Sequence, residues 1–475
     1  MVRKSGGRKG RVLLWCILLL LVVLSPQPSP AQRRGGTLVF GRGGDSVGLD
    51  PALQTDGNSF MVTDNLYDQL VHFREKSTEL APGLAERWEV SEDGLRYTFH
   101  LRRGVRFHDG SPFDADAVVF SLGRQMARPK LRWHGKPLSL PRPAGAYQYW
   151  ASMAMDEIVD RVEALGRHRV RITLKRREAP FLANLAMQFA SIVSPRAALR
   201  WGEDFSQHPV GTGPFRFVRW VKDDLIELRR NPTFWGGAPP LARVIFRAIP
   251  DNTARLLELE AGSVDILQHP NPEDLPRLAR DPRFRLVRQA GMNVAYLGFN
   301  TERDPFRDRR VRRAIAHAIQ KRALVEALYL GLGRAAVNPL PPMVWGYHKG
   351  IRGYPHDPKR ARELLREAGF PGGFETTLWT MTVPRPYMPK PLRVAEAIQA
   401  DLRKVGVRAR IVTFEWGTYL HKTRQGEHDM FLLGWTGDNG DPDNFLFILL
   451  DGLADPFVRV RWKHPEFHSL MVRAK

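Results

Sequence analysis

Residues 434–445, with the sequence GWTGDNGDPDNF, are the stretch from which the fold of this chain is predicted. They follow an apolar run at residues 430–433 that predicts a buried β-strand. At the end of that run the sequence changes abruptly to glycine, aspartate and proline. Glycine lets the backbone approach a ligand closely, and aspartate offers a fixed negative charge. The same residue types also form ordinary surface turns, so the stretch alone leaves both interpretations open.

A second polar cluster, VPRPY at residues 383–387, also follows a predicted strand, at residues 374–381. A predicted helix at residues 392–405 and another predicted strand at residues 407–414 lie between the two clusters. Strand, helix and strand in this order make a βαβ unit, in which the strands run parallel and their carboxyl ends share one edge of the sheet. Ligands of open parallel sheets bind beyond that edge. Both polar clusters are therefore expected at the ligand-binding edge.

The two clusters bring opposite charges to this edge. Arg385 lies in the first cluster and Asp438 in the second. A ligand with an ammonium group at one end and a carboxylate at the other would satisfy both side chains. The alternative is that Arg385 and Asp438 pair with each other and have only a structural role.

Three segments resemble a known family: residues 378–387 (LWTMTVPRPY), 415–417 (EWG) and 434–445. They are similar to the family-5 extracellular solute-binding proteins of bacterial ABC importers, whose members take dipeptides, oligopeptides, nickel chelates, glutathione or haem. Residues 104–120 and 208–215 are also similar to this family. The resemblance implies an α/β protein with the two-lobe periplasmic binding protein fold (type II, cluster C-like), an extra small domain and a ligand cleft between the lobes.

The resemblance also implies a division of the chain. The expected parts are a signal peptide at residues 1–31, lobe I at residues 36–70 and 208–292, a small domain inserted at residues 71–207, and lobe II at residues 293–475. Members of the family continue past the position of Lys475, and that part returns to lobe I. We therefore expect the return to lobe I to be missing here, which adds an inactive remnant to the alternatives.

The resemblance assigns ligand contacts to individual residues. In the peptide-binding members an aspartate holds the peptide ammonium and an arginine holds the peptide carboxylate, and these positions match Asp438 and Arg385. The other matching ligand-binding positions are Tyr387, Trp416, Trp435 and Gly437. We expect the aromatic residues to form apolar walls around the peptide.

The composition agrees with a soluble protein of two or three domains, because 475 residues are too many for one ordinary domain. A net charge of +22 raises the possibility of nucleic-acid binding. The arginines are interleaved with acidic residues, however, as at residues 307–313 and 359–363, and no nucleic-acid-binding motif occurs. We therefore expect an arginine-rich surface and no nucleic-acid partner.

The first residues have the pattern of a secretory leader. A basic start precedes an apolar run at residues 12–24, which is shorter than the roughly 20 residues that span a bilayer. Small residues at positions 29 and 31 predict cleavage before Gln32 and export to the periplasm. A retained membrane anchor is the alternative. The only cysteine, Cys16, lies in this leader, so a disulfide or a cysteine metal site is not expected in the processed chain.

Further elements follow from periodicity and capping signals. Alternating residues predict hairpins at residues 84–102 and 159–174. Helical spacing predicts one amphipathic helix at residues 311–330, and an aspartate followed by proline predicts the start of another helix at residue 357. An apolar strand at residues 291–300 is expected to cross into lobe II.

The predicted function is therefore capture of di- or oligopeptides in the periplasm and delivery to a membrane permease driven by separate ATPase subunits. The processed chain shows no Cys/His pair, zinc motif or nucleotide-binding motif, so we expect a monomeric binding protein with no enzymatic activity, no metal and no cofactor. The alternatives are another solute, such as a nickel chelate, haem or glutathione, and a secreted peptide hydrolase.

Overall fold

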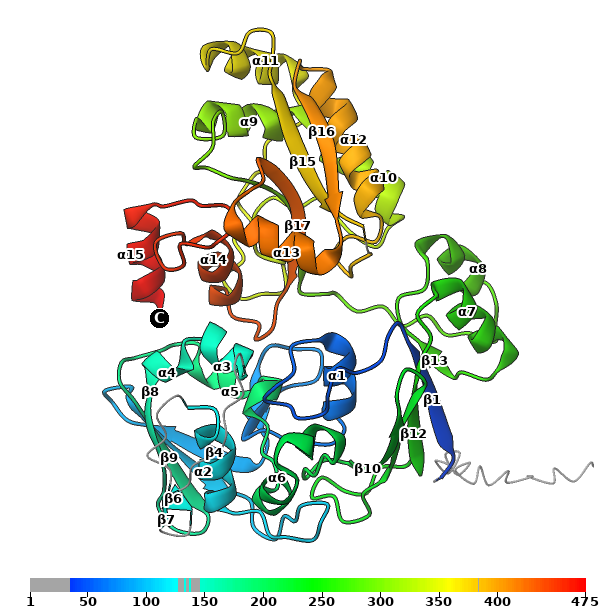
Figure 1. Ribbon diagram of the computed structural model, residues 1–475, viewed down its shortest axis with the longest axis vertical. Helices are drawn as coiled ribbons and strands as arrows, with labels where there is room; N and C mark the ends of the chain where they lie inside the picture. Colours follow the sequence, from blue (N-terminus) through cyan, green and yellow to red (C-terminus); the bar gives the residue numbers. More distant parts are fainter. Residues whose placement is uncertain (1–34, 127–131, 134–135, 138–145, 383) are drawn as a thin grey trace, which may run out of the picture.

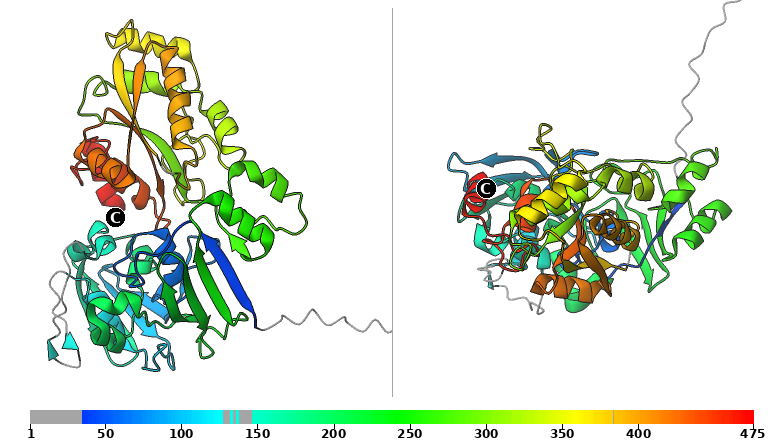
Figure 2. Two further views of the ribbon diagram at one scale, coloured as in Figure 1. Left: turned by 45° about the vertical axis from the view of Figure 1, so that its right-hand side comes forward. Right: turned by 90° about the horizontal axis from the view of Figure 1, so that it is seen from above.

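The computed structural model describes residues 35–126, 132–133, 136–137, 146–382 and 384–475. The predicted signal peptide lies outside these residues. The chain forms two bodies joined at one side, with lobe I and the small domain in the lower body and lobe II in the upper body (Figure 1). A turned view shows the same two bodies, with the helices coloured green beside the connection between them (Figure 2).

Lobe I is built on a five-stranded sheet in the order β10-β11-β12-β1-β13. Strand β1 pairs in parallel with β12 and β13, and the remaining neighbours are antiparallel. Buried apolar side chains from β10, β11, β12 and helix α1 form its core. The elements are β1 (Thr37–Arg42), α1 (Gly57–Thr63), β10 (Phe215–Val221), β11 (Leu225–Arg230), β12 (Arg243–Ala248), α7 (Asn252–Ala261), β13 (Ile266–Leu267) and α8 (Leu275–Leu278).

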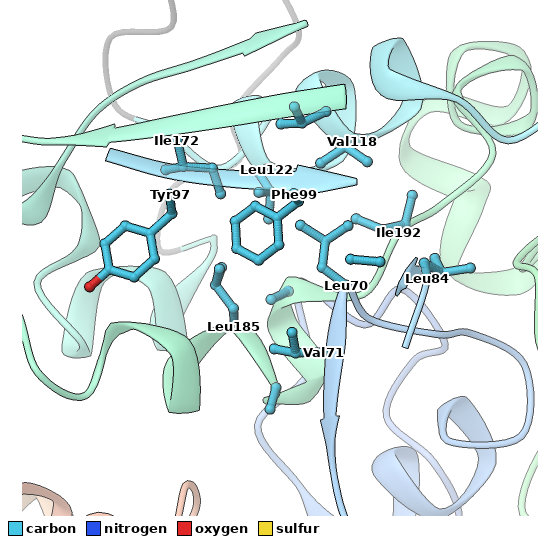
Figure 3. Close-up of a cluster of buried hydrophobic side chains, with 14 of the residues drawn as sticks. Leu70, Val71, Leu84, Tyr97, Phe99, Val118, Leu122, Ile172, Leu185 and Ile192 are labelled. Carbon is cyan, nitrogen blue, oxygen red and sulfur yellow. The ribbon is translucent and has the colours of Figure 1, made fainter. Parts of the chain in front are cut away.

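The small domain contains a four-stranded antiparallel sheet in the order β4-β5-β9-β8. Both predicted hairpins are confirmed, since β4 pairs with β5 and β8 pairs with β9. Every second side chain of β5 and β9 is buried, so one face of the sheet joins helices α2 and α5 in one core (Figure 3). The elements are β2 (Val71–Phe73), β3 (Leu80–Pro82), β4 (Ala85–Val90), β5 (Arg96–Leu101), α2 (Ala115–Gly123), β6 (Arg132–Trp133), β7 (Lys136–Pro137), α3 (Gln148–Ser152), α4 (Met155–Ile158), β8 (Val159–Ala164), β9 (Arg169–Leu174) and α5 (Phe181–Leu185).

The segment after α5 contributes first to the core of the small domain and then to the core of lobe I. Phe189 and Ile192 are buried in the core of the small domain, whereas Val193, Ala197 and Phe205 are buried in the core of lobe I. Helix α6 (Pro195–Trp201) therefore packs with lobe I, although the predicted small domain extended to residue 207.

Lobe II has a four-stranded sheet in the order β14-β17-β15-β16. The predicted βαβ unit is confirmed, because β15 and β16 are parallel and helix α12 lies between them in sequence and packs on both. The predicted buried strand after residue 429 is β17, which is parallel to β15 and antiparallel to β14. The elements are β14 (Asn293–Phe299), α11 (Pro358–Glu367), β15 (Glu375–Met381), α12 (Pro391–Arg403), β16 (Arg408–Phe414), α13 (Trp416–Gln425), β17 (Met430–Thr436), α14 (Asp443–Leu450) and α15 (Pro465–Ala474).

The predicted single helix at residues 311–330 is wrong. The structure has two helices there, α9 (Arg309–Ala318) and α10 (Lys321–Tyr329), separated by Ile319 in an extended conformation with ψ 123°. The backbone N–H of Gln320 donates to the Asp401 carboxylate of α12 at 2.9 Å instead of continuing the helix. The helical spacing of apolar residues continues through both helices because both pack against the core of lobe II. The spacing alone therefore did not indicate the break.

The predicted start of the next helix is confirmed. The Asp357 side chain accepts a hydrogen bond from the backbone N–H of Arg360 at 2.9 Å, which caps α11, and Pro358 is its first residue.

The described chain passes from α8 of lobe I into β14 of lobe II (Figure 1). After β17 the described residues contain helices α14 and α15 and no further strand. Among residues 35–475 with their gaps, no helix combines the length and apolar character needed to cross a membrane.

A buried ion pair ties the loop after β1 to the small domain. The Arg124 guanidinium, just after α2, donates to both carboxylate oxygens of Asp50 at 2.6 and 2.7 Å. Both side chains are almost fully buried, with 5% and 6% of their surface exposed. Loss of one charge would leave the other buried without compensation.

We expect Asp50→Asn to lower the free energy of unfolding by about 3–5 kcal/mol, because Arg124 would keep its charge in a buried position. Urea denaturation followed by circular dichroism measures this. Glu163→Gln, which removes an exposed partner of Arg161, serves as the control and should change stability by less than about 1 kcal/mol. Equal effects of the two substitutions would contradict the structural role given to Asp50.

Candidate ligand site

The candidate site lies at one edge of the sheet of lobe II. Strands β15 and β17 are parallel neighbours, with Leu378 opposite Met430, so their carboxyl ends share an edge. The loops after these strands carry Arg385 and Asp438. This edge points toward lobe I and the small domain, and the loop after β17 extends toward them (Figure 1).

Asp438 is held by hydrogen bonds from two different parts of the chain. The Tyr149 hydroxyl of α3, in the small domain, donates to Asp438 Oδ1 at 3.1 Å. The Asn444 side chain of α14 donates to Oδ2 at 3.4 Å, and its Oδ1 accepts from the Asp438 backbone N–H at 3.0 Å. Burial raises the pKa of Asp438 to about 6. Among the described residues no cationic side chain pairs with this carboxylate.

Arg385 is a cation that lacks an acidic partner among the described residues. Its guanidinium carbon lies 3.6 Å from the centre of the Trp416 ring, which is a cation–π contact. Its Nε is buried and has no hydrogen-bond partner. Burial lowers the pKa of Arg385. The guanidinium is therefore held on an aromatic surface with donors left for a ligand.

The predicted alternative, an ion pair between Arg385 and Asp438, is not what the structure shows. Among the described residues each of the two charges has neutral neighbours, Trp416 for the arginine and Tyr149 and Asn444 for the aspartate. Two opposite charges are thus kept separate beyond the ends of adjacent strands.

Of the other predicted site residues, Trp416 lies near Arg385, whereas Trp435 and Gly437 lie near Asp438. Trp416 lies beside Arg385, and Trp435 lies beside the aspartate loop, where its Nε1 donates to Asn444 Oδ1 at 2.7 Å. Gly437 is buried, and its N–H donates to the Met292 carbonyl at 2.8 Å.

Tyr387 is partly buried against strand β17 of its own lobe. A Cβ atom at Gly434 would lie 2.2 Å from Cδ2 of the Tyr387 ring, so this glycine lets the ring lie across the strand. The Tyr387 carbonyl also accepts a hydrogen bond from Tyr329 at 3.1 Å.

Residues of the small domain also reach the aspartate loop, and sequence reasoning missed them. Besides Tyr149, Asn184 of α5 accepts a hydrogen bond from the Asn439 side chain at 2.8 Å, and both of these asparagines are buried. Thr78 packs against Gly440. No spacing or motif links residues 149 and 184 to residue 438, because the contact is created by the approach of two separate bodies.

A concave region lies at the opposite end of the same sheet from Arg385 and Asp438. It has a volume of about 620 Å³ and is formed by the amino ends of β15 and β16 together with the end of α12. It is lined mainly by polar and charged side chains, among them Arg403, Arg408, Arg410 and Asp429. Since Arg385 and Asp438 follow the carboxyl ends of the strands, this hollow is not the candidate site.

Within the described residues, no cluster of three or more histidine, cysteine or acidic side chains is arranged to hold a metal ion.

Residues 79–455 match the model of the bacterial extracellular solute-binding proteins, family 5, middle region. The dipeptide-binding protein of Escherichia coli K12 is 42% identical, with 100% of this chain and 89% of that protein covered. The heme-binding protein A of Haemophilus influenzae is 43% identical, with 94% and 83% covered.

A solved structure shows the same likeness in three dimensions. It is an ABC transporter-associated periplasmic binding protein of Helicobacter pylori in complex with the peptide STSA. The identity is 40%, the TM-score is 0.80, and the match covers 94% of this chain and 87% of that one. This likeness agrees with the two-lobe α/β fold that the sequence predicts.

The contact between Gly434 and Tyr387 gives a test of the site's packing. We expect Gly434→Ala to destabilise the protein by about 1–3 kcal/mol, because the added methyl group overlaps the Tyr387 ring. Urea denaturation checks this value. Combining it with Tyr387→Ala should recover part of the loss, since the two changes share one contact. Simple addition of the two losses would contradict the proposed packing.

Proposed function

This chain belongs to family 5 of the bacterial extracellular solute-binding proteins, and we propose that it captures short peptides for an ABC importer. In this proposal the peptide binds between the lobes, with its ammonium on Asp438 and its carboxylate on Arg385. The likeness to peptide-binding relatives supports the ligand class. The charges at the sheet edge support the assignment of its two ends.

The observation that carries the proposal is the separation of two uncompensated charges. Both side chains are partly buried, and withdrawing a charge from water without a partner is unfavourable, so Asp438 and Arg385 are stabilised when a ligand supplies the missing partners. The termini of a peptide do so with charge-assisted hydrogen bonds, and a guanidinium can hold a carboxylate through two of them. Neighbouring strands lie about 4.8 Å apart and two extended residues span about 7 Å, so anchors on adjacent strands suit a short peptide.

The remaining residues of the site would surround the peptide between its ends. Trp416 and Trp435 would form apolar walls, Tyr387 would support β17, and Gly437 would leave room for the Phe445 ring beside the aspartate loop. Closure of the lobes would exclude water from the site and strengthen both charge pairs.

We further propose that a monomer works in the periplasm, after removal of residues 1–31, and delivers its ligand to permease subunits that are driven by separate ATPase subunits. Lobe II would move relative to the body that lobe I and the small domain form together, with the change from one to the other near residue 292. In this proposal the peptide leaves intact, without hydrolysis and without a cofactor.

Haem is the second candidate, because a relative at 43% identity is named a heme-binding protein. A haem molecule carries carboxylates and no ammonium group. It could pair with Arg385 and would leave Asp438 without a partner. The arrangement of the two charges therefore favours a peptide.

Isothermal titration calorimetry with Ala-Ala, longer peptides and haem tests the ligand class. We expect Ala-Ala to bind, and Asp438→Asn and Arg385→Gln each to weaken binding by about 100-fold or more, because each leaves one peptide charge unpaired. Asp160→Asn and Arg393→Gln, at exposed side chains, are the matched controls and should bind normally. Binding of haem alone would overturn the peptide proposal, and release of free alanine would overturn the proposal that no hydrolysis occurs.

The raised pKa of Asp438 predicts a pH dependence of binding. Because the ligand ammonium stabilises the carboxylate, binding lowers a pKa that is about 6 in the free protein. Affinity should thus be greatest near pH 7 and should fall toward tenfold per pH unit below about pH 6, since a proton must first leave Asp438. It should also begin to fall toward pH 8, where the ligand ammonium loses its proton. Calorimetry between about pH 4.5 and 8 measures this, and Asp438→Asn should bind weakly without the fall below about pH 6. A wild-type affinity that does not change across this range would contradict the assignment of Asp438.

A further inference from the structure

The concave region at the far end of lobe II lies away from the candidate ligand site and is lined by Arg403, Arg408 and Arg410. It is formed where β15 and β16 begin and α12 ends, and Figure 1 places these amino ends at the end of lobe II away from lobe I. The length of β15 (Glu375–Met381) separates it from the loop of Arg385 by about 20 Å. Its volume of about 620 Å³ is in the range of small-molecule sites.

The positions of these arginines are fixed by a strand, a helix and one hydrogen bond between them. Arg408 and Arg410 are two residues apart in β16, so their side chains leave the same face of the strand. Arg403 is the last residue of α12 and lies one turn after Gln399 on the same helix face. The Gln399 side chain donates to the Ala409 carbonyl at 2.7 Å, which ties α12 to β16 between the two strand arginines. Connected regular elements therefore bring the three side chains to one hollow.

The two acidic side chains that line the hollow are neutralised within the protein. Glu375 forms an ion pair with Arg408 at 3.2 Å. Asp429 pairs with Arg303 at 3.1 Å and accepts hydrogen bonds from the backbone N–H and the hydroxyl of Thr377, at 3.0 and 2.7 Å. These acids therefore leave the other two arginines of the hollow without a negative partner.

Arg403 and Arg410 are the two cations left over. Within the described part of the chain, neither side chain forms an ion pair, a hydrogen bond or a cation–π contact. Both are exposed, so their N–H donors face solvent. A guanidinium group offers five N–H donors in a planar fork and binds an oxyanion through two parallel hydrogen bonds. Two such groups in one hollow suit an anion that carries more than one charge.

We propose that this hollow is a second ligand site, which binds a small phosphate-bearing anion with two or more negative charges. Arg403 and Arg410 would hold its oxygens, and Arg408 would add positive charge while it remains paired with Glu375. A singly charged carboxylate engages one guanidinium fork and leaves the other free, so it should bind more weakly. The site would work independently of peptide capture, because it lies at the opposite end of the sheet from Arg385.

An arginine-rich surface without a specific site makes a different prediction. The chain has a net charge of +22, so anions are attracted to it in general. In that case every exposed arginine would contribute about equally to anion binding. Arg161→Gln/Arg393→Gln therefore provides a matched control, because it removes two exposed arginines that lie outside the hollow.

The experiment titrates the wild type, Arg403→Gln/Arg410→Gln and the matched control with inorganic pyrophosphate by calorimetry at one fixed salt concentration. The variant in the hollow should bind pyrophosphate about tenfold more weakly or worse, because it loses charge-assisted hydrogen bonds. The control should change by about twofold or less, since exposed charges outside the site interact weakly with the ligand. Acetate, which carries one charge, should bind the wild type at least about tenfold more weakly than pyrophosphate.

Arg385→Gln shows whether pyrophosphate binds in the hollow or at the free arginine of the peptide site, and it should bind pyrophosphate as the wild type does. Loss of pyrophosphate binding in Arg385→Gln would overturn the inference. So would no binding by the wild type, or equal weakening in the hollow variant and in the matched control. Binding only to phosphatidylglycerol vesicles would also overturn it, since that would indicate a basic surface for membranes.

Binding of Ala-Ala by Arg403→Gln/Arg410→Gln should equal that of the wild type, which also confirms that the variant is folded. Failure of the wild type to bind Ala-Ala, with pyrophosphate binding retained, would overturn the peptide proposal and leave the second site in place. Failure of pyrophosphate alone would do the reverse.

Discussion

The parallel pairing of β15 with β17 is the constraint on which the candidate site depends. Parallel strands place their carboxyl ends at one edge, so two loops that are about 50 residues apart in sequence carry their charges to the same place. The connection through α12 and β16 makes this arrangement possible, because a parallel pair needs a long crossover. If β17 were antiparallel to β15, Arg385 and Asp438 would lie at opposite ends of the sheet.

Among the described residues, neither of the two charges at this edge has an oppositely charged partner. Arg385 is placed on the face of Trp416, and Asp438 receives hydrogen bonds from neutral side chains only. The buried pair of Asp50 and Arg124 shows the opposite arrangement, in which the two charges satisfy each other. The Asp50–Arg124 pair stabilises the fold, whereas keeping Arg385 and Asp438 apart does not. We therefore interpret the separation of these two charges as a feature of ligand binding.

Local patterns were enough to predict much of the fold. The βαβ unit and both hairpins follow from apolar periodicity and turn residues, which act within a few neighbouring positions. The break between α9 and α10 could not be predicted in this way, because the acceptor for Gln320 is Asp401, on a later helix. The packing of helix α6 with lobe I was missed for a similar reason, since it depends on contacts with residues far away in the sequence.

The site residues that follow predicted strands could be predicted from the sequence. The residues that reach the site from the other body could not. Arg385 and Asp438 could be placed at one edge from the order of strands and helix alone. Tyr149 could not, because nothing within its own segment indicates that it contacts a loop 289 positions later in the chain. A consequence concerns how such proteins diversify. Since an inserted module contributes a polar group beside the aspartate, substitutions within residues 146–152 could retune ligand preference while the parallel sheet that carries the two charges is inherited unchanged.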